Sequence, residues 1–280
     1  MTKTIDLIYF NAGGGHRAAA SALESVMRQR HPGWTVRCVD LFQVLDARGR
    51  FRDVFGAGPE AYYNQRLARG WTLGLAQELK VLQAFIRLAH GPMARILEQH
   101  WLRTEPDLVV SLVPNFNRLM RLSVGAALPG VPYVTVLTDL ADFPPHFWIE
   151  PDLDQHIVCG TEQALRQARA AGYPDERLHL TSGMILRPDF YRAPTGDRSL
   201  ERQSIGLDPQ RPTGLVLFGG HGARGMEAIA RQLDDVQLIL LCGHNAALAD
   251  DIRALPSRAP RAVVGFTPDV ARYMRMADFF

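Results

Sequence analysis

The opening of the chain contains the feature that most constrains its fold. Residues 5–10 form a short apolar run with β-branched and aromatic side chains, glycines occupy 13–15, and helical composition begins at Ala18. This pattern predicts a strand, a glycine turn and a helix. Glycines let the backbone pass close to a ligand, and the first amides of a helix carry a partial positive charge that suits a phosphate or an oxyanion. Within the turn, His16 is the side chain that can exchange a proton near neutral pH.

Three interpretations of this turn remain open from its residues alone. Residues 13–18 fit the G-x-G-x-x-G/A dinucleotide fingerprint, with Asp40 where a ribose-binding carboxylate would stand. Alternatively, His16 is a general base at a helix N-terminus, where the local field favours the neutral, proton-accepting imidazole. The third interpretation is a tight turn whose histidine faces solvent.

The same pattern returns in the second half of the chain. A strand over 214–218, a glycine turn over 219–225 and a helix over 226–233 repeat the opening motif. A single dinucleotide-binding domain does not predict this repetition, whereas a two-domain enzyme with a ligand cleft between paired sheets does. We therefore expect an α/β protein with two Rossmann-like, doubly wound domains over 1–190 and 191–280, the second truncated at its C-terminus because the chain stops within a fourth strand.

Alternating strands and helices support parallel sheets in both halves. The expected strands are 5–10, 34–39, 107–113, 131–138, 156–159, 178–181, 214–218, 236–242 and 261–264. The expected helices are 17–29, 115–128, 161–171, 226–233 and 245–255, with a short one from Ser199.

Composition narrows the classes of partner. The net charge of +2 gives no overall field that favours nucleic acid, so we expect no nucleic-acid partner. Three widely spaced cysteines match neither a disulfide framework nor a zinc site, and no segment reaches the ~20 apolar residues of a membrane span. We expect a cytoplasmic protein, with any membrane contact peripheral and at the inner face of the cell membrane.

Residues 47–103 differ from the rest of the chain. They are helical in composition, lack a strand signal, and contain nine basic against four acidic residues. Their abundant apolar side chains suit an interfacial segment that docks on an anionic membrane surface. The alternative is that these helices simply pack on the sheet with solvated arginines.

Several motifs, in order along nearly the whole chain, resemble the monogalactosyldiacylglycerol synthase family. They are Gly13-Gly14-Gly15-His16-Arg17-Ala18, Thr138-Asp139-Leu140, Pro145-His146-Phe147-Trp148, Cys159-Gly160-Thr161-Glu162, Gly183-Met184-Ile185-Leu186-Arg187-Pro188, Phe218-Gly219-Gly220, Gly265-Phe266-Thr267 and Met274-Arg275-Met276-Ala277-Asp278. That family belongs to the lipid-directed inverting glycosyltransferases with the GT-B fold.

The resemblance implies transfer of a hexose from a UDP-sugar to diacylglycerol or a related lipid at a membrane surface. It places the acceptor in the N-terminal domain and the donor in the C-terminal domain, with His16 as catalytic base. The residues implied on the acceptor side are Gly13, Gly14, Gly15, Pro145 and Trp148. Those implied for the donor are Gly219, Gly220, His221, Gly222, Asn245, Phe266 and Thr267, although relatives often carry another polar residue in place of His221. A ribose-holding acidic residue is expected to lie beyond Phe280.

The chemistry of this transfer agrees with the residues present. Attack by a lipid hydroxyl needs a base, for which we predict His16, and a stabilised leaving diphosphate, for which we predict the second glycine turn with Arg224. Asp139 either orients His16 or binds the sugar, or is an ordinary turn or helix-cap aspartate. Because these groups supply both functions, no metal or other cofactor is expected. Residues 152–154 do match the D-x-D pattern that other glycosyltransferases use for a cation, but we interpret them as a turn. The alternatives are a UDP-sugar epimerase or hydrolase and a non-catalytic nucleotide-sugar-binding module.

Overall fold

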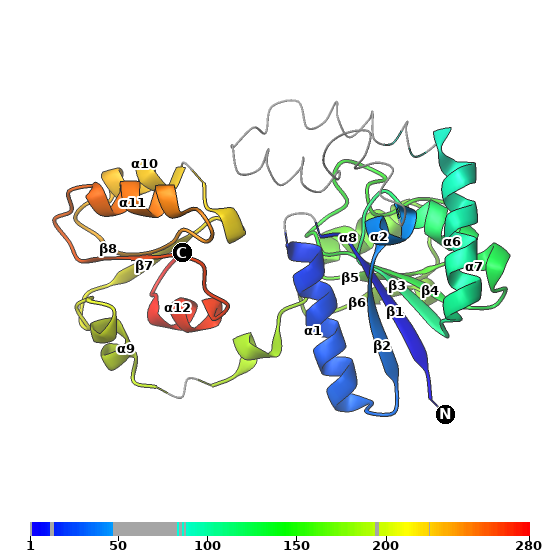
Figure 1. Cartoon of the computed structure of the whole chain (residues 1–280), viewed down its shortest axis with the longest axis horizontal. Helices are drawn as coiled ribbons and strands as arrows, with labels where there is room; N and C mark the ends of the chain where they lie inside the picture. Colours follow the sequence, from blue (N-terminus) through cyan, green and yellow to red (C-terminus); the bar gives the residue numbers. More distant parts are fainter. Residues whose placement is uncertain are drawn as a thin grey trace. The chain divides into compact units, whose positions relative to one another are not determined.

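The chain divides into two compact units, which are described separately (Figure 1). The computed structural model describes residues 2–11, 14–46, 83, 86, 88–193, 196–223 and 225–280, without the side chain of His221. The first unit contains the described residues up to Pro188, and the second contains those from Asp189 to Phe280. Most of the segment that we expected to dock on membranes, 47–82, lies outside the described residues, as do Gly13 and Arg224.

The first unit is built on a six-stranded parallel sheet with the order β2-β1-β3-β4-β5-β6. The strands are β1 (Thr4–Tyr9), β2 (Thr35–Asp40), β3 (Leu108–Ser111), β4 (Tyr133–Val136), β5 (His156–Cys159) and β6 (Leu178–Leu180). Apolar residues on both faces of β1 are buried, as expected for a parallel strand that helices cover on two sides. The expected α/β fold with a parallel sheet is therefore confirmed in this unit.

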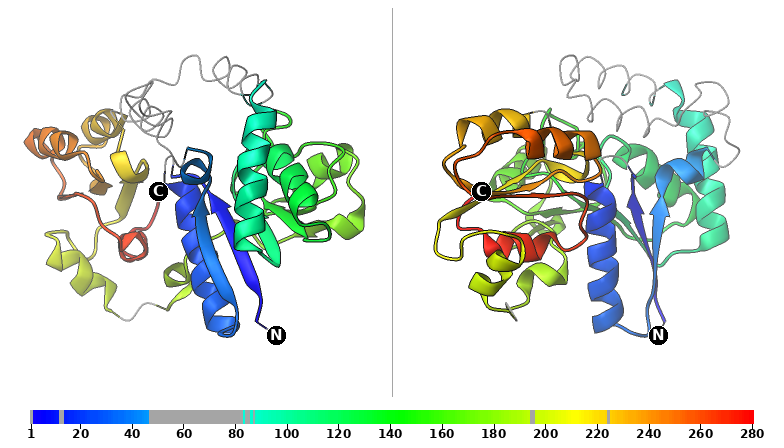
Figure 2. Two further views of the ribbon diagram at one scale, coloured as in Figure 1. Left: turned by 45° about the vertical axis from the view of Figure 1, so that its right-hand side comes forward. Right: turned by 60° about the vertical axis from the view of Figure 1, so that its left-hand side comes forward.

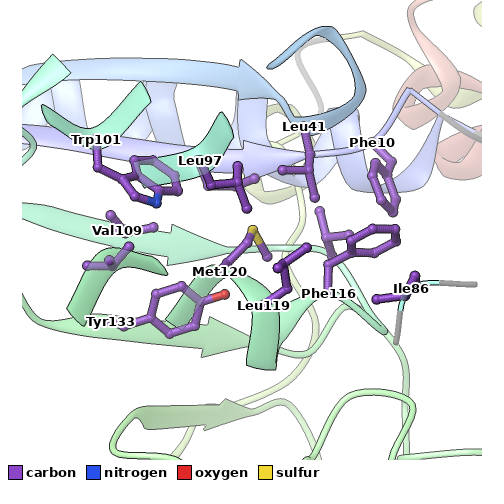
Figure 3. Packing of buried hydrophobic residues seen from close by; sticks show 13 residues of the cluster. Phe10, Leu41, Ile86, Leu97, Trp101, Val109, Phe116, Leu119, Met120 and Tyr133 are labelled. Atoms are coloured by element: carbon purple, nitrogen blue, oxygen red, sulfur yellow. The ribbon is translucent and has the colours of Figure 1, made fainter. Parts of the chain in front are cut away.

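Helices cover both faces of this sheet. They are α1 (Gly15–Arg30), α2 (Leu41–Leu45), α6 (His90–Thr104), α7 (Asn117–Ala127) and α8 (Glu162–Ala170), with a 3-10 helix, η1, at Asp175–Arg177. One face of β1 and β3 packs on α1, which lies along β1 and β2 in both views of Figure 2. Ile8 and Val109 point to the other face, where Trp101 of α6 and Met120 of α7 complete a core that Figure 3 shows from close by.

The second unit contains a three-stranded parallel sheet with the order β7-β8-β9. Its elements are η2 (Pro188–Tyr191, which begins in the first unit), α9 (Arg198–Ser204), β7 (Thr213–Leu217), η3 (Gly219–His221), α10 (Gly225–Gln232), β8 (Gln237–Leu241), α11 (Ala246–Ala254), β9 (Arg261–Val264) and α12 (Val270–Met276). Helices α10 and α11 pack on one face and α12 on the other (Figure 1). Phe279 forms a parallel bridge to Gly214 of β7, whereas β8 pairs along the whole of β7.

In each sheet, the strand that precedes a glycine turn has later parts of the chain paired on both of its sides, so the strand order changes direction there. In the first unit, β2 and β3 lie on opposite sides of β1; in the second, Phe279 and β8 both pair with β7. Ligands of open parallel sheets bind beyond the carboxyl ends of strands at such switch points.

Among the described residues, none of the helices has the length and apolar character that a bilayer span requires.

Candidate active site

The first glycine turn presents His16 at the carboxyl edge of the larger sheet. Gly14 precedes α1 with a φ of 82°, a left-handed conformation that favours glycine, and its carbonyl accepts the Ala18 amide at 3.0 Å. A Cβ atom added at Gly14 or Gly15 would meet nothing within 4 Å. Gly14 and Gly15 are therefore open on their outer sides, and His16 stands in the first turn of the helix.

Groups from two further strands meet the His16 ring. Its Nδ1 atom lies 3.2 Å from the Thr138 hydroxyl oxygen, just beyond β4, and the ring forms a hydrogen bond with the backbone of Leu112, just beyond β3. Asp139, the next residue after Thr138, contributes an exposed carboxylate that interacts electrostatically with the ring. The structure thus brings together His16 and Asp139, which are separated by more than 100 residues in the sequence.

Trp148 completes one wall of this site. Its side chain is completely buried, its ring centroid lies 5.9 Å from that of His16, and its indole N–H donates to Oδ2 of Asp139 at 2.7 Å. We expected Trp148 on the acceptor side of the site. In the structure its indole contacts Asp139 and the imidazole, while Pro145 of the same loop is exposed.

Electrostatics around His16 favour a neutral ring that can accept a proton. Burial lowers the pKa of His16 below its ordinary value, and the Asp139 carboxylate and the Leu112 hydrogen bond oppose this shift without cancelling it. At neutral pH the imidazole is therefore unprotonated. The same carboxylate would stabilise the imidazolium that forms once the ring takes up a proton.

The second glycine turn follows β7 and includes η3. Gly219 and Gly222 have φ values of 66° and 62°, and a Cβ atom at Gly222 would stand 3.0 Å from the Cys242 carbonyl oxygen. The Gly220 carbonyl accepts the His244 amide at 2.9 Å, which ties this turn to the loop after β8. Gly220 itself has an open outer side, with nothing within 4 Å of an added Cβ atom.

The remaining residues expected on the donor side lie beyond β8 and β9. Asn245 caps α11, because its side-chain oxygen accepts the Leu248 amide at 3.1 Å. Thr267 accepts the Asp269 amide through its hydroxyl at 3.1 Å. Phe266 is 59% exposed and stacks on His244 with ring centroids 4.0 Å apart.

Sequence reasoning missed His244 as a member of this group. The available signal was its position two residues after the predicted strand 236–242, at the same edge as the end of the next strand.

Two other sequence matches have structural explanations. The Asp40 carboxylate, a candidate ribose ligand of a dinucleotide site, is buried and caps α2 by accepting the Phe42 amide at 3.0 Å. In the D-x-D match, Asp154 pairs with Arg121 and Arg177, each at 2.8 Å. Within the described residues, no group of three or more His, Cys, Asp or Glu side chains is placed to hold a metal ion.

Sequence comparisons relate this chain to galactolipid synthases. The family model described as monogalactosyldiacylglycerol (MGDG) synthase matches residues 16–183. The chain is 26% identical over 310 residues to the probable monogalactosyldiacylglycerol synthase 2 of Oryza sativa, covering 99% of this chain and 61% of the relative. It is 24% identical over 301 residues to monogalactosyldiacylglycerol synthase 1 of Arabidopsis thaliana, covering 99% and 53% respectively. The chain thus spans between about half and three fifths of the length of these relatives.

Solved structures with a similar fold include nucleotide-sugar enzymes. MurG of Acinetobacter baumannii matches with a TM-score of 0.54 and 13% identity, covering 99% of this chain and 70% of its own. Anabaena HepE in complex with UDP matches with a TM-score of 0.55 and 16% identity, covering 99% and 72%. The UDP-GlcNAc 2-epimerase of Methanocaldococcus jannaschii matches with a TM-score of 0.51 and 12% identity, covering 99% and 77%. At these identities the likeness concerns the fold alone, and it confirms the expected GT-B class.

Proposed function

Because the chain belongs to the monogalactosyldiacylglycerol synthase family, we propose that it transfers a hexose from a UDP-sugar to a hydroxyl of diacylglycerol or a related lipid. The observation that carries the proposal is the neutral, half-buried imidazole of His16 beside the Asp139 carboxylate. A lipid hydroxyl is a weak nucleophile, and its attack on an anomeric carbon needs a group that removes its proton. His16 has both the protonation state and the neighbour that this task requires.

In the proposed reaction, His16 takes the proton as the lipid oxygen forms a bond to the anomeric carbon. The bond from that carbon to the diphosphate oxygen breaks, and UDP leaves with the electron pair. Attack opposite to the leaving group inverts the anomeric configuration. Asp139 stabilises the resulting imidazolium, in agreement with the upward effect of its carboxylate on the His16 pKa.

The second unit would hold the donor. The open turn around Gly220 precedes α10, where backbone amides and the helix N-terminus suit the developing charge on a diphosphate. Phe266 offers an exposed aromatic face beyond β9 for the uracil ring. The fold shared with UDP-bound HepE is consistent with a UDP-sugar as the donor.

We further propose that the protein acts as a peripheral protein on the cytoplasmic face of a membrane. The basic excess of residues 47–103 favours an anionic surface. Near the end of this segment, Leu88 and Leu102 are 86% and 57% exposed, which suits contact with the lipid interface.

Sugar transfer by the purified full-length protein tests the proposal. Radiolabelled UDP-galactose and UDP-glucose are supplied with diacylglycerol vesicles, and the lipid product is counted. The His16→Ala variant is expected to lose about 10²- to 10⁴-fold in kcat, the range usual for general-base catalysis. His31→Ala is the matched control, because His31 caps the opposite end of the same helix and stacks on Trp34. A loss below about tenfold in the His16 variant would remove His16 from the role of base.

A lipid-free arm separates this proposal from the alternatives. A UDP-sugar epimerase shares the fold, and an epimerase or hydrolase would form its product in water alone. Tight binding of UDP with no turnover in either arm would instead identify a binding module. Transfer that strictly requires the lipid supports the glycosyltransferase.

A further inference from the structure

The loop between β4 and β5 carries three of the groups around His16: Thr138, Asp139 and Trp148. Asp142 lies in the middle of this loop, is only 5% exposed, and has a carboxylate bonded to backbone amides of the loop itself. Its Oδ1 accepts the Trp148 amide at 2.6 Å, and its Oδ2 accepts the His146 amide at 2.9 Å. A buried carboxylate that accepts hydrogen bonds from two backbone amides fixes the local backbone conformation, because charge-assisted hydrogen bonds are strong.

Helix α8 anchors the same loop from outside. The Gln167 side chain forms two hydrogen bonds with the backbone of Asp142: its Oε1 accepts the amide at 2.8 Å, and its Nε2 donates to the carbonyl at 3.0 Å. The Thr161 hydroxyl, at the start of the helix, donates to the Leu140 carbonyl and also accepts the Ala164 amide at 3.1 Å. The loop is therefore attached at two consecutive turns of a capped helix.

These contacts form a continuous chain from α8 to the imidazole. Gln167 fixes the backbone of Asp142, Asp142 fixes the amide of Trp148, and the indole of Trp148 fixes the Asp139 carboxylate beside His16. We infer that Asp142 and Gln167 are positioning residues that set the place of Asp139 and Trp148 at the proton-accepting site. The inference rests on the proposed function for its catalytic consequence, but its structural part can be tested without activity.

The indole N–H signals of Trp148 and Trp101 provide the activity-independent test. In Asp142→Asn, an amide group replaces one of the two acceptor oxygens and faces a backbone donor, so the Trp148 indole should shift away from Asp139. In ¹⁵N-¹H spectra, the Trp148 signal, assigned with Trp148→Phe, is expected to move upfield in both Asp142→Asn and Asp139→Asn. The Trp101 signal should stay in place, because that indole bonds to Ser123 at 2.9 Å in a different core. An unmoved Trp148 signal in Asp142→Asn would overturn the inference.

Kinetics in two backgrounds distinguish positioning from a general loss of structure. We expect Asp142→Asn to lower kcat about tenfold in the wild-type background and by less than about twofold in an Asp139→Asn background, with the KM for the UDP-sugar unchanged. Gln167→Ala should reproduce this pattern from the helix side. Asp175→Asn is the matched control, because Asp175 pairs with Arg169 of the same helix, at 2.8 Å, away from the loop.

Equal losses in the two backgrounds would mean that Asp142 acts independently of Asp139 and would overturn the inference. If the wild-type protein transfers no sugar, the proposed function fails, and the Trp148 signal alone decides whether Asp142 holds the loop.

Discussion

Burial lowers the pKa of both His16 and His100, but the charged groups around the two rings differ in sign. His100, on α6, is 8% exposed, and burial together with Arg103 and Arg37 lowers its pKa to about 4. Near His16, a carboxylate opposes the effect of burial instead. The carboxylate beside His16 would stabilise the protonated ring, whereas the two arginines near His100 would destabilise it.

The pH dependence of transfer should report the charge beside His16. A general base works in its unprotonated form, so kcat/KM is expected to fall as the pH decreases through the pKa of His16, which lies below the ordinary 6.5. The Asp139 carboxylate raises that pKa, so Asp139→Asn should lower it and move the acidic limb of the pH profile to lower pH. Profiles of log kcat/KM between pH 4.5 and 8 measure the shift. An unmoved limb would place Asp139 outside the electrostatic reach of the base.

The buried His100 should make the first unit sensitive to acid. Its folded-state pKa lies below its unfolded value, so the unfolded chain binds the proton more readily, and stability present above pH ~6.5 is lost as the pH falls toward 4. The loss is expected to be on the order of 2–3 kcal/mol. His100→Gln removes the titrating group and should flatten this dependence. Urea unfolding at pH 7 and pH 4.5, followed by the fluorescence of the adjacent Trp101, measures the unfolding free energy of both proteins. An equal loss of unfolding free energy between the two pH values in wild type and in His100→Gln would contradict the role given to His100.

At the scale of elements, local pattern predicted the strands and helices well. The spans expected at 156–159 and 261–264 coincide with β5 and β9. The span expected at 131–138 is longer than β4, which ends at Val136; Thr138, beyond its end, lies beside His16. A run of apolar residues in the sequence does not show where a strand ends and an apolar loop begins.

The site could be predicted only in part, for a physical reason. His16 stands out because a glycine turn and a helix start flank it in the sequence. Asp142 and Gln167 carry no such local signal, because their contacts join residues 25 positions apart and exist only after α8 has packed. The burial of Trp148 likewise follows from tertiary packing, and its sequence motif carries no signal for it.

Two glycines of the second glycine turn allow folding and ligand binding to be tested separately. Gly222 has a φ of 62° and no room for a Cβ atom, so Gly222→Ala should destabilise the second unit by about 1–2 kcal/mol. Gly220 has no positive φ and an open outer side, so Gly220→Ala should fold normally but bind UDP more weakly, because the added methyl group would stand where a diphosphate approaches. Thermal unfolding and UDP calorimetry measure the two effects. Wild-type UDP affinity in Gly220→Ala would exclude this turn from the donor site.

At the scale of the whole molecule, charge is distributed unevenly along the chain. The net charge is only +2, whereas residues 47–103 hold nine basic and four acidic residues, so the remainder is net acidic. A protein with this distribution has little general attraction for polyanions but can be oriented by one segment on an anionic surface. Orientation matters for the proposed reaction, because its acceptor resides in the bilayer and its donor in water.

Vesicle binding should therefore depend on lipid charge, on salt and on this segment. Co-sedimentation is expected to rise with the anionic lipid fraction and to fall as salt increases. Neutralising Arg48, Arg50 and Arg52 with glutamine should weaken binding at least about tenfold, since each basic residue near an anionic surface contributes about 1 kcal/mol. Neutralising Arg166, Arg231 and Arg253, which changes the net charge equally elsewhere, should have little effect. Equal weakening in both triple variants would show that overall charge, and not residues 47–103, drives the attachment.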